Sequence, residues 1–405
     1  MRSEEVPTFG VLQGVNVLCC GTAIAGPFAA TLMGEQGANV IHLENVGGGD
    51  QVGRSSSAWG LDHRNQRCLS LDIGKAEGQE VFLRLAKWAN IIIESSKGGT
   101  FEKLGLDDEY LWKYNPSLVI VHLSGYGQNG LDTYVGRPGY DGIAQAFSGY
   151  MHWNGVALPD MPLRVKPYTA DYVAPLFVAF SAISALRHAH STGKGESIDV
   201  AQYETMLRIQ GSYLQSALND SKTKMRSGNR EDGWAIYDAF RCKDEKFVMI
   251  MILGVPMWKK AISFFCLDKD PDFDDVHGVL WRPSTAANKA DAAVSAYCKE
   301  RNAAEVESEL NSINIACSMI MTPQDMLNHP HYHARDTLIE WYDHKLERTI
   351  VGPNIIPKFI KSKPVIWRTG ADYSSDTTDI LKDLGYAENE IHDLAQRAVI
   401  PSTHL

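Results

Sequence analysis

The sequence predicts an α/β protein: a large domain with a mostly parallel sheet, and a smaller α+β domain. Short apolar runs alternate with helical patterns over the first 200 residues. A charged segment at 219–234, without apolar periodicity, then interrupts the chain, and two apolar runs around a short polar turn follow it. Strands that alternate with helices need crossover connections, which favour a parallel sheet covered by helices on both faces.

In the large domain, the first strand is predicted over 15–20 ("VNVLCC"), followed by a helix that Pro27 opens and that ends near Gly37. The next strand is "ANVIHLEN". A helix at "GQEVFLRLAKWA" leads to the strand "NIIIES", and "DDEYLWKYNP" leads to the strand "SLVIVHLSG". The long apolar helix within 166–195 ends at Gly193, and a further helix is predicted over 202–218.

The second domain begins with a predicted hairpin, in which "AIYDAFRC" and "FVMIMIL" flank the polar turn "KDEK". Helices at 256–266 and 289–311 and the strand "NIACSMIM" follow, and then come another hairpin at 338–352 and two short terminal helices. The predicted division is 1–218 for the first part of the large domain, 219–234 for a linker, 235–321 for the small domain, 322–335 for a return linker and 336–405 for the completion of the large domain.

The amino-acid composition argues against several classes of protein. Lys and Arg number 39 against 49 Asp and Glu, so a net charge of −10 argues against a general nucleic-acid or membrane-surface binder. The seven cysteines show neither CxxC metal spacing nor a disulfide framework. The N-terminus lacks the apolar core of a signal peptide and no run approaches about 18 apolar residues, so we expect a cytoplasmic protein without a membrane partner.

Three common motifs are absent or incomplete. In "GTAIAGP", Gly21 and Gly26 are four residues apart, which is not G-x-G-x-x-G, so close packing of turn and helix explains them better than a dinucleotide site. The histidines of "HPHYH" (329–333) stand beside a proline without a Cys or Glu pattern, which favours a solvated turn and no metal site. No G-x-S-x-G motif supports a serine hydrolase.

Asp171 stands at the mouth of the long apolar helix. An aspartate just before the first turn accepts backbone N–H bonds, so on the residues alone capping is the favoured role. Basic side chains also lie in or beside loops that follow strands: Arg64, Arg67, Lys97, Lys103 and Arg137. In an acidic protein such a set suits a polyphosphate ligand, although spacing alone does not distinguish it from ordinary solvated side chains.

These residues belong to a longer pattern that resembles the class III, formyl-CoA-like CoA-transferases. The segments that carry the resemblance run nearly end to end: "AIAGPFA" (23–29), "VIHLENV" (40–46), "ESSKGGTFEKLGL" (94–106), "NPSLVIVHLSGYGQNG" (115–130), "AQAFSGY" (144–150), "PYTADY" (167–172), "GKGESIDVAQYE" (193–204) and "GPNIIPKF" (352–359). Among these enzymes, "LENV" with "PYTADY" is most similar to the bacterial L-carnitine CoA-transferases.

The resemblance implies that Asp171 is a nucleophile. Its carboxylate would attack an acyl-CoA thioester to give a mixed anhydride, the CoA thiolate would convert this to an enzyme–CoA thioester, and an incoming acid would reverse the steps. The implied acids are L-carnitine, crotonobetaine or γ-butyrobetaine. Another acid, for example with succinyl-CoA as donor, is the alternative. Coenzyme A enters as substrate, and no metal is implied.

The resemblance also implies roles for the loop residues. Lys97 and Lys103 are expected to contact the CoA phosphates, with Arg64, Asn65 and Tyr140 as pocket members. Carnitine-type members tend to carry two arginines where this chain has Lys103 and Leu104, which puts a bidentate phosphate contact in doubt. A trimethylammonium group would need aromatic partners. The candidates are Tyr126, Tyr140, Tyr150, Trp153 and Tyr172.

The implied architecture is an interlocked, ring-like homodimer whose Rossmann-like large domain contains both termini. Two other functions remain open at this point. Racemases of this superfold carry a histidine before the aspartate that corresponds to Asp141, whereas this chain has Tyr140, so the base for proton abstraction is missing. A non-catalytic CoA-binding protein is the other possibility, against which the intact Asp171 argues.

Overall fold

The structure is a computed structural model that describes residues 1–220, 225–231, 233–276 and 278–402. The chain forms two compact units. The large unit comprises Met1–Tyr150, Val165–Gly211 and Asp336–Leu405, and the small unit comprises Met151–Arg164 and Ser212–Arg335. The third segment of the large unit thus starts where the sequence predicts, at 336. Residues 151–164 and 212–218, which we assigned to the large domain, group with the small unit instead. Residues 221–224 and 232 of the predicted linker lie outside the described residues.

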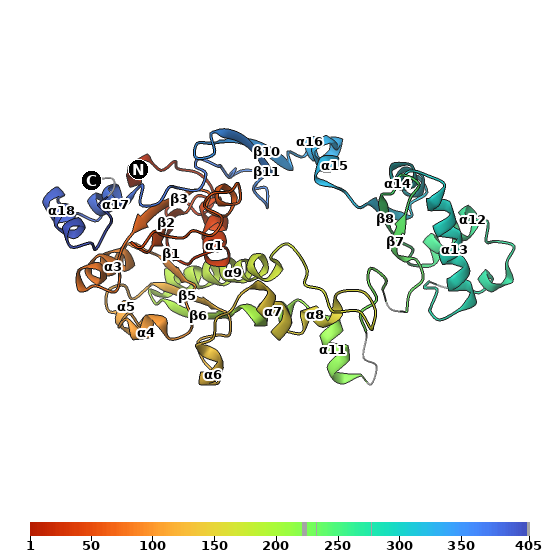
Figure 1. Ribbon diagram of the computed structural model, residues 1–405, viewed down its shortest axis with the longest axis horizontal. Helices are drawn as coiled ribbons and strands as arrows, with labels where there is room; N and C mark the ends of the chain where they lie inside the picture. Colours follow the sequence, from red (N-terminus) through yellow and green to blue (C-terminus); the bar gives the residue numbers. More distant parts are fainter. Residues whose placement is uncertain (221–224, 232, 277, 403–405) are drawn as a thin grey trace. The chain divides into compact units, whose positions relative to one another are not determined.

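The large unit is built on a six-stranded parallel sheet, which confirms the predicted fold class (Figure 1). The strand order is β3-β2-β1-β4-β5-β6, so the order reverses between β1 and β4. The strands are β1 (Asn16–Cys20), β2 (Asn39–Glu44), β3 (Gln66–Ser70), β4 (Ile91–Glu94), β5 (Val119–Ser124) and β6 (Glu196–Ala201). Ligands of open parallel sheets bind outside the carboxyl ends of the strands at such a reversal.

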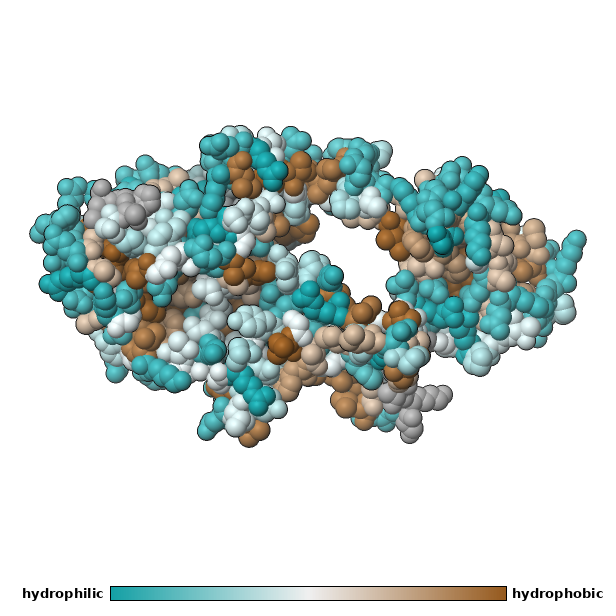
Figure 2. Space-filling view, viewed as in Figure 1, coloured by the Kyte–Doolittle hydropathy of each residue, from teal (hydrophilic) through white to brown (hydrophobic). Residues whose placement is uncertain are grey.

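Helices cover both faces of this sheet, as crossover connections require. One face packs against α1 (Ala25–Gly34) and α9 (Thr169–Thr192), through the cluster that includes Met33, Ile93 and Val178. The other face packs against α3 (Ala76–Trp88), α5 (Asp108–Trp112), α17 (Thr377–Asp383) and α18 (Glu388–Gln396). Figure 2 shows hydrophilic residues over α18, whose apolar side chains Ile391 and Leu394 are buried in the core.

The C-terminal segment closes an edge of the sheet. Backbone groups of β3 bond to it repeatedly: Cys68 N–H to Asp376 Oδ2 (2.8 Å) and Ser70 N–H to Thr377 Oγ1 (3.1 Å). Asn65, just before β3, donates its N–H to the carbonyl of Arg368 (3.0 Å). An open strand edge is a template for pairing with other chains, so this segment protects it.

The small unit is α+β, as expected from the hairpin signature. Antiparallel strands β7 (Tyr237–Arg241), β8 (Phe247–Met251) and β9 (Ala316–Met319) form its sheet. Its main helices are α12 (Val255–Phe264), α13 (Thr285–Lys299) and α14 (Ala303–Ser312), with α8 (Tyr150–Trp153), α11 (Ser212–Asn219), α15 (Pro323–Asn328) and α16 (Pro330–Ala334) outside the sheet. The last two lie within the predicted return linker 322–335.

Local signals explain where the structure departs from the predicted elements. The single helix predicted over 202–218 is two, α10 (Gln202–Arg208) and α11, separated by Gly211 at φ +55°. The helix predicted over 289–311 is also two, because Asn302 and Glu305 form a reciprocal capping box that starts α14. Strand β3 was not predicted, since "QRCLS" has no apolar run.

The remaining elements of the large unit are short helices around the sheet and one hairpin in the C-terminal part of the chain. They are α2 (Trp59–Asp62), α4 (Thr100–Lys103), α6 (Asp132–Val135) and α7 (Asp141–Phe147), with the 3-10 turn at Ser3–Glu5. The hairpin pairs β10 (Leu338–Asp343) with β11 (Arg348–Pro353) antiparallel, as predicted.

Helix α9 is the longest helix among the described residues. We expected that no segment would be apolar enough to cross a membrane, and this helix contradicts that expectation. Among the described residues it alone is long and apolar enough by length and composition. In the structure, Ala174, Val178 and Ala182 of this helix are fully buried in the cluster shared with α1 and the sheet. Its other face carries exposed Leu176, Phe180 and Ile183. The helix therefore serves as a core element with one apolar side left uncovered within this chain.

Candidate active site

A cavity of about 120 Å³ lies at the carboxyl ends of four strands of the large unit. It is lined by the turn after β1 (Thr22 to Ala25), by residues at the ends of β4 and β5, and by the start of α10. The lining residues on which the chemistry depends are Ser95, Ser124, Tyr140, Asp171 and Gln202. The cavity thus occupies the position at which open parallel sheets bind their ligands.

Two pairs of glycines let the backbone close around this cavity. A Cβ placed on Gly21 would lie 2.8 Å from the Cα of Gly26, so the turn and helix α1 pack as closely as the sequence suggests. A Cβ on Gly139 would lie 2.4 Å from the Cα of Gly125. Gly125 and Gly139 both line the cavity, so the loop after β5 reaches the loop before α7 only because neither residue has a side chain.

Asp171 is the third residue of α9 and lies in its first turn, not before it. The capping role that we favoured on the residues alone falls to another residue. Asp141, at the start of α7, accepts the backbone N–H of Ala170 through Oδ1 (2.8 Å). Its carboxylate is buried and is itself held by Gln145 Nε2 (3.0 Å). Asp171 instead lines the cavity.

Gln202 is a hydrogen-bond partner of Asp171. It is the first residue of α10, immediately after β6, and its side chain is buried and lines the cavity. Its Nε2 atom donates a hydrogen bond to Oδ1 of Asp171 (2.5 Å). Gln202 is an uncharged donor, so this hydrogen bond orients the carboxylate without itself adding a positive charge.

A second carboxyl group lies close to Asp171. The hydroxyl of Tyr172 donates to Asp62 (3.2 Å), and Asp62 is buried. Burial is the main cause that raises the pKa of Asp62 to about 6, and the negative charge of Asp171 also raises it. The hydrogen bond from Tyr172 and the positive charge of Arg64 lower this pKa but do not offset burial. Burial also raises the pKa of Tyr172, with the Asp62 charge next. Tyr172 therefore stays protonated and donates to the carboxylate.

The loop after β4 is held by a charged triad, of which Glu94 and His122 are buried and Asp108 is partly buried. Glu94 Oε2 accepts the backbone N–H of Ser96 (2.7 Å), and Glu94 Oε1 pairs with His122 Nδ1 (2.8 Å). On the other side, His122 Nε2 pairs with Asp108 (3.0 Å). Burial alone would lower the pKa of His122, but these two carboxylates raise it to about 10. The imidazolium thus fixes Glu94 and, through Ser96, the loop that carries Ser95 and Lys97.

Of the predicted CoA contacts, three side chains are solvent-accessible. Tyr140 lines the cavity and its ring is largely exposed. Lys97 lies in the loop after β4 and Lys103 ends α4, and both are exposed. These two lysines do not line the cavity of Asp171 but follow the strand that borders it. That these lysines contact the CoA phosphates remains a prediction. Their exposed ammonium groups on flexible side chains are suited to such contacts.

Arg64 and Asn65 lie elsewhere, in a buried network. Arg64 pairs with Glu35 (2.6 Å) and donates to the carbonyl of Pro353 (3.1 Å). Asn65 Nδ2 donates to the carbonyl of Val365 (2.6 Å), and its Oδ1 accepts from two backbone N–H groups of the same segment. Neither residue lines the cavity, and both connect the sheet to the C-terminal segment. Burial raises the pKa of Glu35 to about 7, although the Arg64 charge lowers it.

Behind the cavity, His42, Asp50 and His63 form a buried cluster whose nearest ligand atoms lie within 4.8 Å of one another. Its hydrogen bonds support the cavity wall. His42 Nε2 bonds the carbonyl of Gly21 (2.9 Å), and Asp50 Oδ2 accepts the N–H of Ala23 (2.5 Å). Burial lowers the pKa of His63, so this ring is neutral. The cluster fixes the turn in which Ala23 adopts φ +65°. The histidines of 329–333 do not belong to it.

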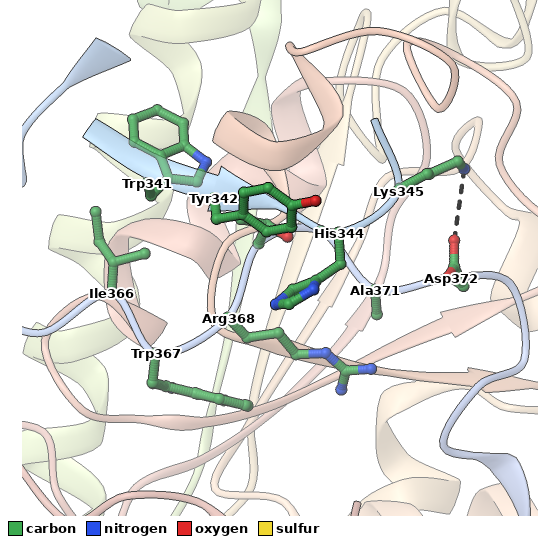
Figure 3. A pocket seen from close by; sticks show the side chains of 11 residues that line it. Trp341, Tyr342, His344, Lys345, Ile366, Trp367, Arg368, Ala371 and Asp372 are labelled. Atoms are coloured by element: carbon green, nitrogen blue, oxygen red, sulfur yellow. Dashed lines mark ion pairs between the residues drawn. The ribbon is translucent and has the colours of Figure 1, made fainter. Parts of the chain in front are cut away.

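A larger cavity, of about 440 Å³, lies between the β10–β11 hairpin and residues 366–372 (Figure 3). Its basic side chains are already paired: Arg368 with Asp376 (2.8 Å) and Lys345 with Asp372 (3.7 Å). None of the residues predicted to be functional lines it. The cavity that contains Asp171 is therefore the candidate active site.

Sequence reasoning missed two residues that shape this site. Gln202 follows β6 directly, but we predicted no strand at Glu196–Ala201, so this signal for a ligand site was missed. Asp141 carries no such signal, because its capping partner Ala170 is remote in the sequence and only the packing of α7 against α9 brings them together.

Comparisons with known proteins identify the family to which this chain belongs. The family model described as CoA-transferase family III matches residues 12–373. The chain is 40% identical over 404 residues to the bile acid CoA-transferase BaiK of Clostridium scindens, covering 98% of this chain and 91% of that protein. The fold matches a CAIB/BAIF family protein from Brucella suis (TM-score 0.78, 24% identity, covering 93% of this chain and 100% of that one). It also matches Rv3272 from Mycobacterium tuberculosis (TM-score 0.76, 22% identity, covering 92% and 99%). The chain belongs to CoA-transferase family III, and it is a CoA-transferase.

Proposed function

We propose that this enzyme moves CoA from an acyl-CoA to a free carboxylic acid through covalent intermediates on Asp171. One observation carries the proposal: a carboxylate that accepts a hydrogen bond from a neutral amide donor lines a cavity at the carboxyl ends of the strands. A carboxylate suits this reaction because anhydrides and thioesters are both activated acyl groups, so exchange between them needs little driving force.

The proposed reaction has four balanced steps. The Asp171 carboxylate attacks the thioester carbonyl carbon, a C–O bond forms, the C–S bond breaks and CoA leaves as thiolate. The thiolate then attacks Cγ of Asp171 and expels the donor acid as carboxylate. The acceptor carboxylate attacks the resulting aspartyl thioester and again releases thiolate. Finally the thiolate attacks the acceptor carbonyl, which yields acceptor-CoA and restores Asp171. Both intermediates are open to hydrolysis, so a small cavity that limits water favours transfer.

We further propose that the CoA nucleotide is held near Lys97 and Lys103, with Tyr140 at the entrance to the cavity. The two ammonium groups are exposed, and the charged triad of Glu94, His122 and Asp108 fixes the loop that carries Lys97. In an acidic protein, such local positive charge is what an anionic nucleotide requires.

For the acid we propose a betaine of the carnitine type: L-carnitine, crotonobetaine or γ-butyrobetaine. The motifs "LENV" and "PYTADY" support this, and so does the small size of the cavity, which suits a short acid. The exposed ring of Tyr140 offers a face to a trimethylammonium group. Of the other aromatic candidates, Tyr172 is engaged by Asp62, and Tyr126 packs in a cluster with Tyr134 and Phe147.

A bile acid is the second candidate, because BaiK, at 40% identity, is named a bile acid CoA-transferase. A fused-ring acid would extend beyond the cavity beside Asp171. Succinyl-CoA as donor is a further alternative within the same chemistry. A racemase is disfavoured, since Tyr140 stands where that chemistry would need a base, and Asp141 is occupied as a helix cap.

We also propose that the enzyme is a homodimer, in keeping with the interlocked architecture that the sequence resemblance implies. The support in this chain is the apolar face of α9, where Leu176 and Phe180 are exposed. Phe180 also lines an apolar hollow with Ile198 and Leu207. Exposed apolar patches of this kind are typical of subunit interfaces.

The proposed function is tested with Asp171→Asn, which keeps the shape and the oxygen that Gln202 contacts. We expect transfer from γ-butyrobetainyl-CoA to crotonobetaine or carnitine to fall by a factor of about 10³ or more, since the nucleophile is lost. In the wild-type enzyme, hydroxylamine quenching and peptide mass mapping should locate the modification at Asp171. Assays with cholate and succinate as acceptors distinguish the acid classes. A folded Asp171→Asn enzyme with wild-type activity would refute the nucleophile.

A further inference from the structure

Gln202 lies where charge would develop during the proposed reaction. Its side chain is 6% exposed, lines the same cavity as Asp171 and donates from Nε2 to Oδ1 of that carboxylate. The residue is fixed at the junction of β6 and α10, where Thr205 Oγ1 bonds its carbonyl (2.8 Å). The donor is therefore held by two regular elements and does not depend on a loop.

We propose that Gln202 is a catalytic residue that stabilises the oxyanion formed on Asp171 each time its carbonyl carbon is attacked. This inference rests on the proposed function and adds a residue that neither the motifs nor the family resemblance assigns. A neutral amide suits the task, because it donates to a negative oxygen without neutralising the carboxylate that must first act as nucleophile.

The geometry assigns different tasks to the two oxygens of Asp171. If Oδ2 attacks the thioester, it becomes the bridging oxygen of the anhydride, and Oδ1 becomes the carbonyl oxygen next to Gln202. When the CoA thiolate adds to Cγ, the C–S bond forms and the electron pair of the C=O bond moves to Oδ1. Collapse restores this double bond and breaks the Cγ–Oδ2 bond, so the donor acid leaves with Oδ2. No proton is transferred, and Gln202 donates to Oδ1 throughout.

The surroundings strengthen such a donor. The cavity is small. Two neighbouring carboxyl groups that do not line it already have partners: Asp62 accepts from the Tyr172 hydroxyl, and Asp141 accepts the Ala170 N–H of α9. In a water-poor site, one fixed hydrogen bond to a developing oxyanion has a much larger effect than in solution.

The test is Gln202→Met, which removes the N–H donor and keeps the length of the side chain. We expect kcat to fall by about 10² to 10³, the usual effect of removing one oxyanion donor, while KM for acyl-CoA changes by less than about twofold because ground-state binding is untouched. Gln202→Asn, whose amide falls short by one methylene, should show the same kcat loss. The matched control is Gln210→Met, a buried glutamine that donates to the Ser148 carbonyl (2.7 Å) outside the cavity. It should keep wild-type kcat.

A second readout follows the oxygens. With an ¹⁸O-labelled acceptor acid, mass spectrometry of the Asp171 peptide after many turnovers should show one labelled oxygen in the wild-type enzyme, because only Oδ2 is exchanged. In Gln202→Met, where Oδ1 loses its donor, two labels are expected. Wild-type kcat in a folded Gln202→Met enzyme, or two labels in the wild-type enzyme, would overturn the inference. Asp171→Asn in the same assay separates the two proposals. If it is inactive, the proposed function stands even when the role of Gln202 is overturned. If it is active, the proposed function itself is refuted.

Discussion

Two carboxylates lie at the first turn of α9 and have different contacts: Asp171 belongs to that turn, and Asp141 reaches it from the start of α7. Asp141 accepts the Ala170 N–H and is buried, so it stabilises the helix start as a capping residue does. Asp171 accepts a hydrogen bond from a side-chain donor, Gln202, and lines the cavity. Loss of its charge should leave the fold intact, which makes the Asp171→Asn test clean.

The two exposed lysines allow a direct test of the nucleotide site. Lys97→Ala and Lys103→Ala should each weaken acyl-CoA binding by about 0.5–1.5 kcal/mol, the range of a single hydrogen-bonded contact. This corresponds to roughly a two- to tenfold increase in KM with little change in kcat. Steady-state kinetics with varied acyl-CoA measures it. Lys87→Ala is the control, because this exposed lysine lies near the end of α3, before the amino end of β4, whereas Lys97 follows the carboxyl end of that strand. Equal KM values for all three variants would contradict the assignment.

Among the elements, β4, β5 and α5 are joined by the triad of Glu94, His122 and Asp108, which makes stability depend on pH. Burial would lower the pKa of His122, but its carboxylate partners raise it from 6.5 to about 10. The folded chain therefore keeps a proton that the unfolded chain loses above pH 6.5, so this contribution is full below that pH and is lost as pH rises toward 10. The expected decrease is on the order of a few kcal/mol.

Urea unfolding at several pH values between 6.5 and 10 measures this decrease. In His122→Gln, the part of the slope that comes from the triad should disappear. His190→Gln, at an exposed histidine near the end of α9, should keep the wild-type slope. If His122→Gln and the wild-type enzyme lose stability in parallel, the triad does not hold the proton.

The glycine contact between the loops after β5 and before α7 gives a second prediction at this scale. Gly139→Ala would place a Cβ 2.4 Å from the Cα of Gly125, so the loops must separate. We expect a loss of about 1–3 kcal/mol in stability, as for other overpacked sites, together with reduced activity because both residues line the cavity. Gly136→Ala, three residues earlier with φ −82° and no atom within 4 Å of the added Cβ, should behave as wild type in both assays.

Elements with strong local signals could be predicted from the sequence, and those fixed by distant contacts could not. The apolar runs of β1, β4 and β5 predict buried parallel strands, and the hairpins follow from their polar turns. Strand β3 has a polar sequence and is buried only because the C-terminal segment covers it. Within the site, Asp171 and Tyr140 follow from the family pattern, whereas Arg64 and Asn65 are drawn into a network with residues about 300 positions away.

For the whole molecule, the apolar face of α9 predicts the state of assembly. Phe180 is 74% exposed, in a chain whose net charge of −10 otherwise favours solubility. Phe180→Glu should convert the proposed dimer to a monomer, as measured by sedimentation velocity, because a carboxylate in an apolar interface remains unpaired. Leu218→Glu, at an equally exposed residue of α11, is the control and should remain dimeric. If the Phe180→Glu enzyme is still a dimer, the subunit interface does not involve the apolar face of α9.

The closure of β3 by residues 365–377 has a consequence for biosynthesis. A ribosome that has made the first 211 residues has supplied all six strands of the sheet, but the strand at one margin still lacks its cover. More than 120 residues of the small unit must emerge before Arg368 and Asp376 are available. During that interval, the nascent sheet is exposed to pairing with neighbouring nascent chains. Chaperones that shield growing polypeptides should therefore matter more for the yield of this enzyme than its final stability would suggest.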